Sequence, residues 1–249
     1  MGELKGRCAL VTGAGNGIGR AIAQAFAAAG ARVLLADIDR AAAGRAAAEI
    51  GPAAVARECD VTDAASTRGA VEGAVAAFGK LDLVVSNAAV QSPLATVEDM
   101  REEDWRRALD VNLTGAFNVC KPAIPRLREA GGGVIVIVAS QMARVVNPGQ
   151  TAYCATKGAL VQLAKGMAVD HAKDRIRVNT LSPGGVATDR LARRFGDLEE
   201  AEKVWGPKHP LGRLGRPDEI ARAAVFLASD ASSFMTGSDL LVDGGYTAW

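Results

Sequence analysis

Seven short apolar segments alternate with longer, alanine-rich helical patterns along this chain, and the alternation constrains its fold more than any other feature. Strands that are apolar along their whole length are typical of a parallel sheet covered by helices on both faces. We expect strands at 8–11, 33–36, 53–56, 83–85, 134–138, 176–181 and 240–242. The intervening patterns predict helices at 18–29, 40–50, 64–78, 102–129, 151–172 and 218–228.

This order predicts an α/β chain with a doubly wound Rossmann fold, in which a parallel sheet of about seven strands carries helices on both faces. A length of 249 residues and a hydrophobic content of 49% suit one domain with a large core, so we expect residues 1–249 to form a single domain. Ligands of such a fold bind beyond the carboxyl ends of the strands.

Composition narrows the classes of partner. The 29 basic and 28 acidic residues nearly cancel and form no long run of one sign, so we expect no nucleic-acid surface. The cysteines are far apart and form no C-x-x-C pair, which indicates reduced thiols and no metal site; they are Cys8, Cys59, Cys120 and Cys154. The first apolar segment leaves no room for a signal peptide, and no run approaches the ~20 residues of a membrane span. We therefore expect a cytoplasmic protein that does not enter a membrane.

A glycine-rich turn lies between the first expected strand and the first expected helix. Residues 12–19 read T-G-A-G-N-G-I-G, which is the variant T-G-x-x-x-G-x-G and is wider than the common G-x-G-x-x-G. Glycines permit a tight turn and a close backbone approach, and the following helix offers free N–H groups to a phosphate. The position of the turn favours a dinucleotide site, although glycines also simply permit turns.

Asp37 ends the second expected strand, eighteen residues after Gly19. An acidic residue about 20 residues beyond the turn accepts hydrogen bonds from the adenosine ribose and repels a 2′-phosphate. Arg40 or Arg45 would be needed to recruit NADP, but no cation stands beside Asp37, so NAD is the preferred cofactor. The alternative is that Asp37 only caps a helix, a role that Asp39 also suits.

Ser140, Tyr153 and Lys157 form a candidate acid–base group. Ser140 follows the apolar segment 134–138, and Tyr153 and Lys157 are four residues apart in a helical pattern, so both point to one side. A tyrosine with a pKa of ~10 is a poor proton donor and acceptor at neutral pH unless a cation stabilises its anion, and a lysine does so. The alternative is a surface helix with a half-buried tyrosine and a solvated lysine.

With these pieces the chain resembles the short-chain dehydrogenase/reductase family nearly from end to end. The resemblance rests on the turn at 12–19, Asp37, Asp60-Val61, Asn87-Ala88-Ala89, Asn112, Ser140, Tyr153 with Lys157, Pro183-Gly184 with Thr188, and Asp243-Gly244-Gly245. It implies an NAD(H)-dependent oxidoreductase that interconverts a secondary alcohol and a ketone, or a sugar lactol and a lactone.

The resemblance also implies residue roles. Tyr153 would be the general acid and base, Lys157 would hold the nicotinamide ribose and lower the tyrosine pKa, and Ser140 would hydrogen-bond the reacting oxygen. Asn112 would hold a water that links the lysine to solvent; its alternative is a hydrogen bond to its own helix. The cofactor would contact Gly13, Asn16, Gly17, Ile18, Gly19, Asp37, Ile38, Asp60, Val61, Asn87, Ala88, Ala89, Tyr153, Lys157, Pro183, Gly184, Val186 and Thr188. Cys154, Thr156 and Ala89 depart from the residues usual in the family, but none of them lies on the proton path.

The segment 187–216 is broken by glycine and proline, and in similar proteins this region covers the substrate. Its Arg193, Arg194, Lys208 and His209 could contact an acidic substrate, but we assign the arginines to a solvated helix face and expect no metal partner for His209. Gln141 and Gln150 border the pocket by resemblance and suit a small polyhydroxylated or hydroxy-acid substrate. Asn147, before Pro148, equally suits a solvated loop.

Three alternatives remain at this point. A 3-oxoacyl thioester reductase uses the same catalytic set, whereas an enoyl-type reductase generally has a wider gap between tyrosine and lysine. A non-catalytic NAD(H)-binding sensor or scaffold would keep the fold without needing the serine, tyrosine and lysine. Apolar residues on more than one face of helices 102–129 and 151–172 favour a homotetramer or homodimer, which is usual in the family.

Overall fold

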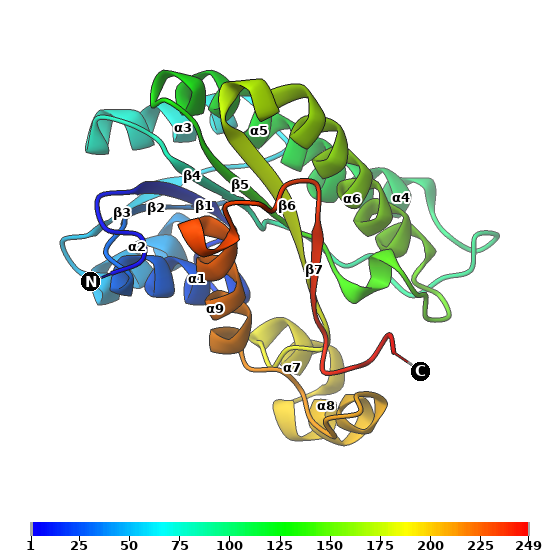
Figure 1. The fold of residues 1–249 in the computed structure, drawn as a ribbon. Helices are drawn as coiled ribbons and strands as arrows, with labels where there is room; N and C mark the ends of the chain where they lie inside the picture. Colours follow the sequence, from blue (N-terminus) through cyan, green and yellow to red (C-terminus); the bar gives the residue numbers. More distant parts are fainter. Residues whose placement is uncertain (1, 249) are drawn as a thin grey trace.

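Seven strands lie side by side in one parallel sheet, in the order β3-β2-β1-β4-β5-β6-β7, which confirms the expected fold class (Figure 1). The computed structural model describes residues 2–248. The strands are β1 (Cys8–Thr12), β2 (Arg32–Asp37), β3 (Ala54–Glu58), β4 (Leu83–Ser86), β5 (Gly133–Val138), β6 (Ile176–Pro183) and β7 (Asp239–Val242).

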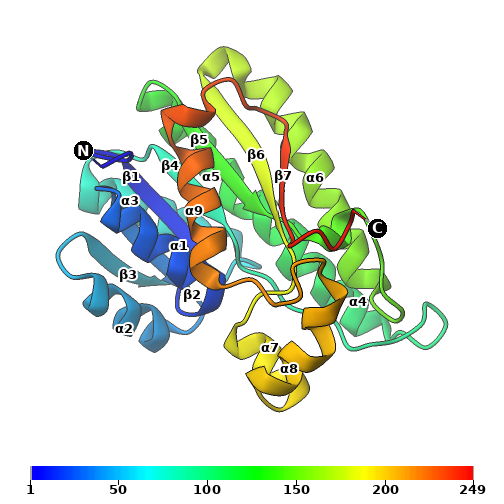
Figure 2. The same ribbon diagram turned by 60° about the horizontal axis from the view of Figure 1, so that its bottom comes forward.

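Helices cover both faces of the sheet (Figures 1 and 2). They are α1 (Gly17–Ala28), α2 (Arg40–Ile50), α3 (Ala64–Phe78), α4 (Glu102–Ala108), α5 (Gly115–Glu129), α6 (Thr151–His171), α7 (Asp189–Phe195), α8 (Leu198–Trp205) and α9 (Pro217–Ala228). Buried residues of α1, α2 and α9 share one hydrophobic core with the sheet, and those of α3, α5 and α6 share the other.

Successive residues of each central strand enter opposite cores, which is why these strands are apolar throughout. Val11 of β1 and Leu35 of β2 belong to the core under α1 and α9. Their neighbours Leu10 and Leu34 belong to the core under α3 and α5. Each such side chain contributes about 1.5–3 kcal/mol by full burial, so a polar residue on either face would be costly.

The edge strand β3 differs from its expectation. It extends from Ala54 to Glu58 instead of 53–56, and four of its five residues are exposed. Arg57 and Glu58 pair in register with Ala36 and Asp37 of β2. Charged side chains are common on an edge strand, where they discourage pairing with other chains.

The helical stretch expected at 102–129 is continuous, but it is not one regular α-helix. The chain forms α4, then a π-helical turn η1 (Leu109–Thr114), then α5, without leaving the helical path. A π turn contains one extra residue and shifts the side-chain phase, and such turns are frequent at functional sites. Here the turn buries Asn112.

The strand order places a cleft at the carboxyl ends of the sheet. The chain passes outward from β1 to β3 and then returns to β4 on the other side of β1, which creates the switch point where ligands of this fold bind. The segment after β6 lies at this end and folds into α7 and α8, which pack together (Figure 2). Gly196, with φ +99°, separates these two helices.

Residues 2–248 lack two features that are typical of other classes of protein. No helix in this range is long and apolar enough to cross a membrane. No group of three or more His, Cys, Asp or Glu side chains in the same range is arranged to hold a metal ion.

Candidate active site

The turn between β1 and α1 requires glycine at several positions. Gly13 and Gly17 have φ of +61° and +53°, in the left-handed region where a side chain is strained. A Cβ added to Gly19 would lie 2.1 Å from the Gly13 carbonyl oxygen, which is too close for any side chain. The lack of a side chain at Gly19 therefore lets the first turn of α1 pack directly against Gly13.

The first turn of α1 offers uncapped backbone N–H groups. Its N-cap residue, Asn16, makes no side-chain hydrogen bond to the helix. The free N–H groups and the positive end of the helix dipole favour an anion at this point. A bare glycine backbone beside a positive helix end fits the pyrophosphate of a dinucleotide.

Asn87 locks this turn to the end of β4. Its Nδ2 donates hydrogen bonds to the carbonyl oxygens of Thr12 and Gly13, at 2.9 and 3.0 Å. The Thr12 hydroxyl oxygen accepts from the backbone N–H of Asn87 and of Ala88, at 3.0 and 3.3 Å. The amide N–H groups of Asn87 are therefore used to hold the turn, and only its Oδ1 is available to a ribose.

Asp37 aims its carboxylate at the turn and does not cap α2. Its Oδ2 accepts from the Gly15 N–H at 2.8 Å, and its Oδ1 accepts from the Asp39 N–H at 3.0 Å. The helix cap is Asp39, which accepts from the Ala42 N–H at 2.9 Å. The alternative that Asp37 is a mere helix cap is therefore wrong.

Ser140, Tyr153 and Lys157 converge on the same cleft. Ser140 follows the end of β5, and its Oγ accepts from the Met142 N–H at 3.1 Å, which leaves its O–H group free to donate. Lys157 lies one helical turn after Tyr153 in α6, with its Nζ 5.6 Å from the centre of the tyrosine ring. Its Nζ donates to the Val138 carbonyl oxygen at 2.9 Å.

Burial shifts the pKa of both Tyr153 and Lys157. Desolvation, followed by the charge of Arg190, lowers the pKa of Lys157 to about 7. Desolvation raises the pKa of Tyr153, and Arg190, Ser140 and Arg194 oppose that rise. Lys157 is not among the groups that shift the pKa of Tyr153, so the expectation that Lys157 lowers the tyrosine pKa stays a prediction.

Asn112 lies behind the wall of the cleft instead of lining it. Its Oδ1 accepts from the Val90 N–H at 2.7 Å, and its Nδ2 donates to the Val90 carbonyl oxygen at 3.0 Å and to the Thr156 hydroxyl oxygen at 3.2 Å. Thr156 in turn donates to the Tyr153 carbonyl oxygen at 2.7 Å. None of these partners belongs to the helix of Asn112, so the alternative of a bond within that helix is wrong.

The cleft brings together the residues expected to contact the cofactor and the two expected substrate contacts. All eighteen expected cofactor contacts line it, from the glycine turn to Thr188, together with Ser140 and the two expected substrate contacts, Gln141 and Gln150. Gln141 is buried, and its Oε1 finds no hydrogen-bond partner within residues 2–248. An amide oxygen without a partner, beside Tyr153 and Ser140, suits a ligand that donates a hydrogen bond.

The segment after β6 supplies residues that the sequence left out. Arg190, Leu191 and Trp205 line the cleft, and so does Arg194, which is partly buried and not on a solvated helix face. A spacing of four residues was the available signal that Arg190 and Arg194 share one side of a helix. Which side faces the cleft depends on how α7 packs, and the sequence does not show that.

His209 and Asn147 hold loops in place. His209 is buried, its Nε2 accepts from the Gly185 N–H at 3.0 Å, and its Nδ1 lies 2.8 Å from the Trp205 carbonyl oxygen. Asn147 accepts from the Tyr246 hydroxyl at 2.9 Å, so it joins its loop to the C-terminal segment instead of only facing solvent. Neither residue is among those that line the cleft.

Known proteins similar in sequence cover nearly the whole chain. A family model described as enoyl-(acyl carrier protein) reductase matches residues 13–247. A D-threitol dehydrogenase of Mycolicibacterium smegmatis is 43% identical, and the match covers 98% of this chain and 94% of that protein. A cis-4-hydroxycyclohexanecarboxylate dehydrogenase of Sinomonas cyclohexanicum is 39% identical over 100% of both chains.

Solved structures agree with these matches. A short-chain type dehydrogenase/reductase from Mycobacterium marinum superposes with a TM-score of 0.93 at 40% identity, over 99% of this chain and 97% of that one. A 3-ketoacyl-(acyl-carrier-protein) reductase from Brucella melitensis, complexed with NADH, superposes with a TM-score of 0.91 at 38% identity, over 98% and 99% of the two chains.

Proposed function

The chain belongs to the short-chain dehydrogenase/reductase family and is an oxidoreductase of alcohols with a nicotinamide cofactor, and we propose that it interconverts a secondary alcohol and a ketone, or a lactol and a lactone, with NAD(H). The observation that carries the proposal is the convergence of Ser140, Tyr153 and Lys157 at one end of a cleft whose other end is the glycine turn. That arrangement supports a proton-transferring role for Tyr153 beside the expected site of the nicotinamide.

Asp37 supports NAD over NADP. Its carboxylate is held by two backbone N–H groups beside the turn, so it cannot easily turn away from an adenosine ribose. A carboxylate there accepts hydrogen bonds from ribose hydroxyls and repels a 2′-phosphate. Ile38, the next residue, is 67% exposed and offers an apolar surface to the adenine.

A nicotinamide in this cleft supplies the acceptor or donor of the hydride. As the phenolate, Tyr153 takes a proton from the substrate hydroxyl, and as the phenol it returns one to the carbonyl oxygen. Ser140 donates its free O–H to the same oxygen and stabilises the negative charge that develops on it. Lys157 holds the nicotinamide ribose, and Asn112 and Thr156 position α6 by tying it to Val90.

The substrate proposed is a small polyhydroxylated or hydroxy-acid compound. Gln141 and Gln150 line the same cleft as Tyr153, and their amide groups suit hydroxyl or carboxylate groups of a substrate. The names of the two relatives support both parts of this class, because one acts on a polyol and the other on a hydroxycyclohexane carboxylate. The segment 187–216, with α7 and α8, is proposed to cover the substrate.

A 3-oxoacyl thioester reductase is the second candidate. The likeness to the Brucella melitensis reductase favours it, since that protein shares the fold over nearly its whole length. A purely NAD(H)-binding sensor is a weaker explanation, because it leaves the grouping of Ser140, Tyr153 and Lys157 without a purpose. The catalytic and cofactor-binding roles given above to Ser140, Tyr153, Lys157 and Asp37 are part of the proposed function.

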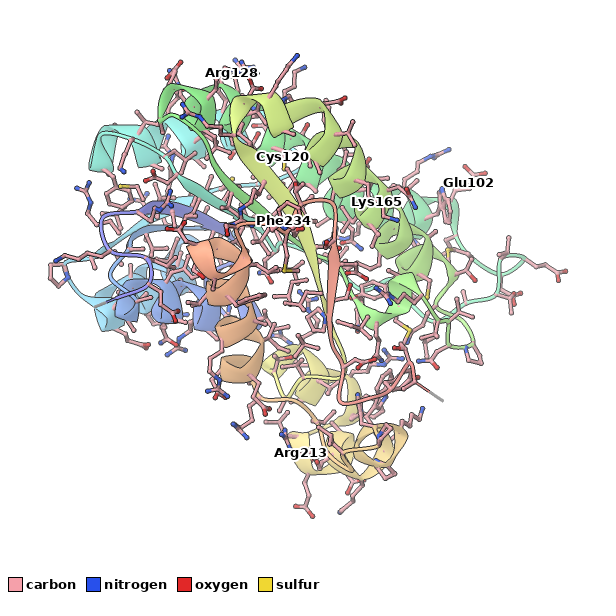
Figure 3. The ribbon with its side chains drawn as sticks, viewed as in Figure 1. Glu102, Cys120, Arg128, Lys165, Arg213 and Phe234 are labelled. Carbon is pink, nitrogen blue, oxygen red and sulfur yellow. The ribbon has the colours of Figure 1, made fainter. Side chains whose placement is uncertain are left out.

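We also propose a cytoplasmic homo-oligomer. Large apolar side chains are exposed outside the cleft on α5, on α6 and after α9, at Phe117, Val169 and Phe234; the last is labelled in Figure 3. A second copy that covers such side chains would remove apolar surface from water. Sedimentation at micromolar concentration tests this, and a monomer there would count against it.

The initial rate of NAD⁺ reduction tests the proposed reaction. The panel contains polyols, aldoses, hydroxy acids and 3-hydroxyacyl thioesters, with NADP⁺ measured in parallel. Turnover of a polyol, aldose or hydroxy acid with NAD⁺ is the expected result. Turnover of the thioesters alone would select the second candidate, and tight NADH binding without turnover of any alcohol would favour a sensor.

A further inference from the structure

Two arginines of α7 reach across the substrate end of the cleft. Arg190 and Arg194 are four residues apart, so they lie on one side of the helix. The Arg190 Nη2 donates to the Ala89 carbonyl oxygen, in the loop after β4, at 2.7 Å. Arg194 reaches the opposite wall, where the Gln150 amide, turned with its oxygen towards the guanidinium, accepts from Nη1 at 3.1 Å and from Nη2 at 3.0 Å.

The positive charges of both arginines are uncompensated. Each guanidinium is held by a neutral oxygen, and within residues 2–248 neither forms an ion pair with a carboxylate. Two other cations of the covering segment are paired with carboxylates: Lys203 contacts Glu199 and Glu200, and Arg213, near α8 in Figure 3, contacts Glu219. Lys208 lies over the Trp205 ring and does not line the cleft. Arg190 and Arg194 line the cleft with charges that can attract an anion.

Few carboxylates oppose these charges. Of the acidic residues that line the cleft, Asp37 and Asp60 lie at and just after the ends of β2 and β3, on the side proposed for adenosine. Asp189 is the first residue of α7, and it is exposed. Arg193, also of α7, adds a further cation to the lining. The substrate end is thus positive, whereas the adenosine end is negative.

Arg194 can bind an anion without losing its present partner. A guanidinium has five N–H donors in one plane, and Gln150 uses two of them. Gln150 is 6% exposed and precedes α6, so its side chain is fixed and holds the guanidinium in one orientation. A carboxylate accepts two parallel hydrogen bonds from such a group, and an oriented guanidinium loses less conformational freedom on binding.

We propose that Arg194, oriented by Gln150, binds the carboxylate of a hydroxy-acid substrate while the secondary alcohol of that substrate lies at Tyr153 and Ser140. This inference rests on the proposed function and narrows its substrate class to anions. The carboxylate is unchanged in the reaction, in which the alcohol carbon gives a hydride to NAD⁺ and the hydroxyl gives its proton to Tyr153. Arg190 adds attraction through its charge.

A pair of substrates that differ only in charge tests the inference. We would measure kcat/KM with NAD⁺ for 4-hydroxycyclohexanecarboxylate and its carboxamide, in the unaltered enzyme, Arg194→Met, Arg194→Lys and Lys203→Met. The unaltered enzyme should prefer the acid by about tenfold or more, and Arg194→Met should abolish that preference. Arg194→Lys should restore part of it, and Lys203→Met, on the outer side of α8, should keep it. An unchanged ratio in Arg194→Met would overturn the inference and leave the proposed reaction standing.

Binding of substrate-like probes to the enzyme–NADH complex tests the inference without turnover. Calorimetry would use cyclohexanecarboxylate, cyclohexanecarboxamide and inorganic phosphate as probes. The inference expects the carboxylate to bind about tenfold tighter than the carboxamide, and Arg194→Met to remove the difference. Equal binding of the two would overturn it, and so would tighter binding of phosphate than of carboxylate. Weaker NADH binding in Arg194→Met, with the carboxylate preference retained, would assign the arginine to the cofactor and also overturn it.

Discussion

The ammonium group of Lys157 donates a hydrogen bond of 2.9 Å to the carbonyl oxygen of Val138, the last residue of β5. This bond ties α6 to the strand that delivers Ser140, so it sets the spacing between the serine and Tyr153. The lysine is only 2% exposed, and no carboxylate within residues 2–248 forms an ion pair with it. Its position is therefore structural as well as chemical.

The first prediction concerns the titration of Lys157 in the cofactor-free protein. Burial lowers its pKa to about 7, so the folded chain binds fewer protons there than the unfolded chain between pH ~7 and ~10.5. The contribution of this site to stability should therefore rise with pH across that window. NMR of the protein with ¹³C-labelled lysine, with the Lys157 signal assigned by its loss in Lys157→Arg, should show Lys157 titrating near neutrality. A Lys157 signal that titrates near the ordinary lysine pKa of ~10.4 would contradict this.

The second prediction separates two neighbouring carboxylates. Asp37→Asn should raise the ratio of NADP⁺ to NAD⁺ efficiency by about tenfold or more, because it removes the charge that repels a 2′-phosphate. Asp39→Asn removes the same charge from the helix cap, a role that asparagine fills equally well, so the ratio should stay near its original value. Steady-state kinetics with both cofactors measures the ratio. Equal shifts in the two variants would remove Asp37 from cofactor selection.

The third prediction tests the turn under the cofactor. Gly19→Ala places a Cβ against the Gly13 carbonyl oxygen and the Asn87 amide, so it should cost about 1–3 kcal/mol of stability and weaken NADH binding. Gly44→Ala, in α2, meets nothing within 4 Å and should instead stabilise the protein by about 0.5–1 kcal/mol. Urea unfolding and NADH titration measure both effects. A Gly19→Ala protein that binds NADH normally would show that the turn is not the cofactor site.

Much of this fold is predictable because its signals are local. The central strands are apolar on both faces, and each begins or ends within two residues of its expected position. The convergence of Tyr153 and Lys157 follows from their spacing in one helix, and that of Ser140 from its place after β5. Such features require no knowledge of distant contacts.

The remaining features depend on contacts between segments far apart in the sequence. The π turn at 109–114 has an ordinary helical pattern, and its Asn112 bonds to Val90 and Thr156. The orientation of Arg194 depends on how α7 packs against the start of α6. The partner of Lys157 is a backbone carbonyl, which no side-chain pattern reveals.

The most direct test of the central claim is the turnover of Tyr153→Phe. This variant removes one hydroxyl group, so kcat/KM should fall by about 10²–10⁴-fold or more while the dissociation constant of NADH stays within about threefold. The matched control is Tyr246→Phe, the other tyrosine of the chain, whose hydroxyl bonds to Asn147 outside the cleft and whose loss should leave turnover nearly unchanged. The predicted result is that Tyr153→Phe loses turnover and Tyr246→Phe keeps it. Undiminished turnover in that variant would show that Tyr153 does not transfer the proton and would contradict the proposed mechanism.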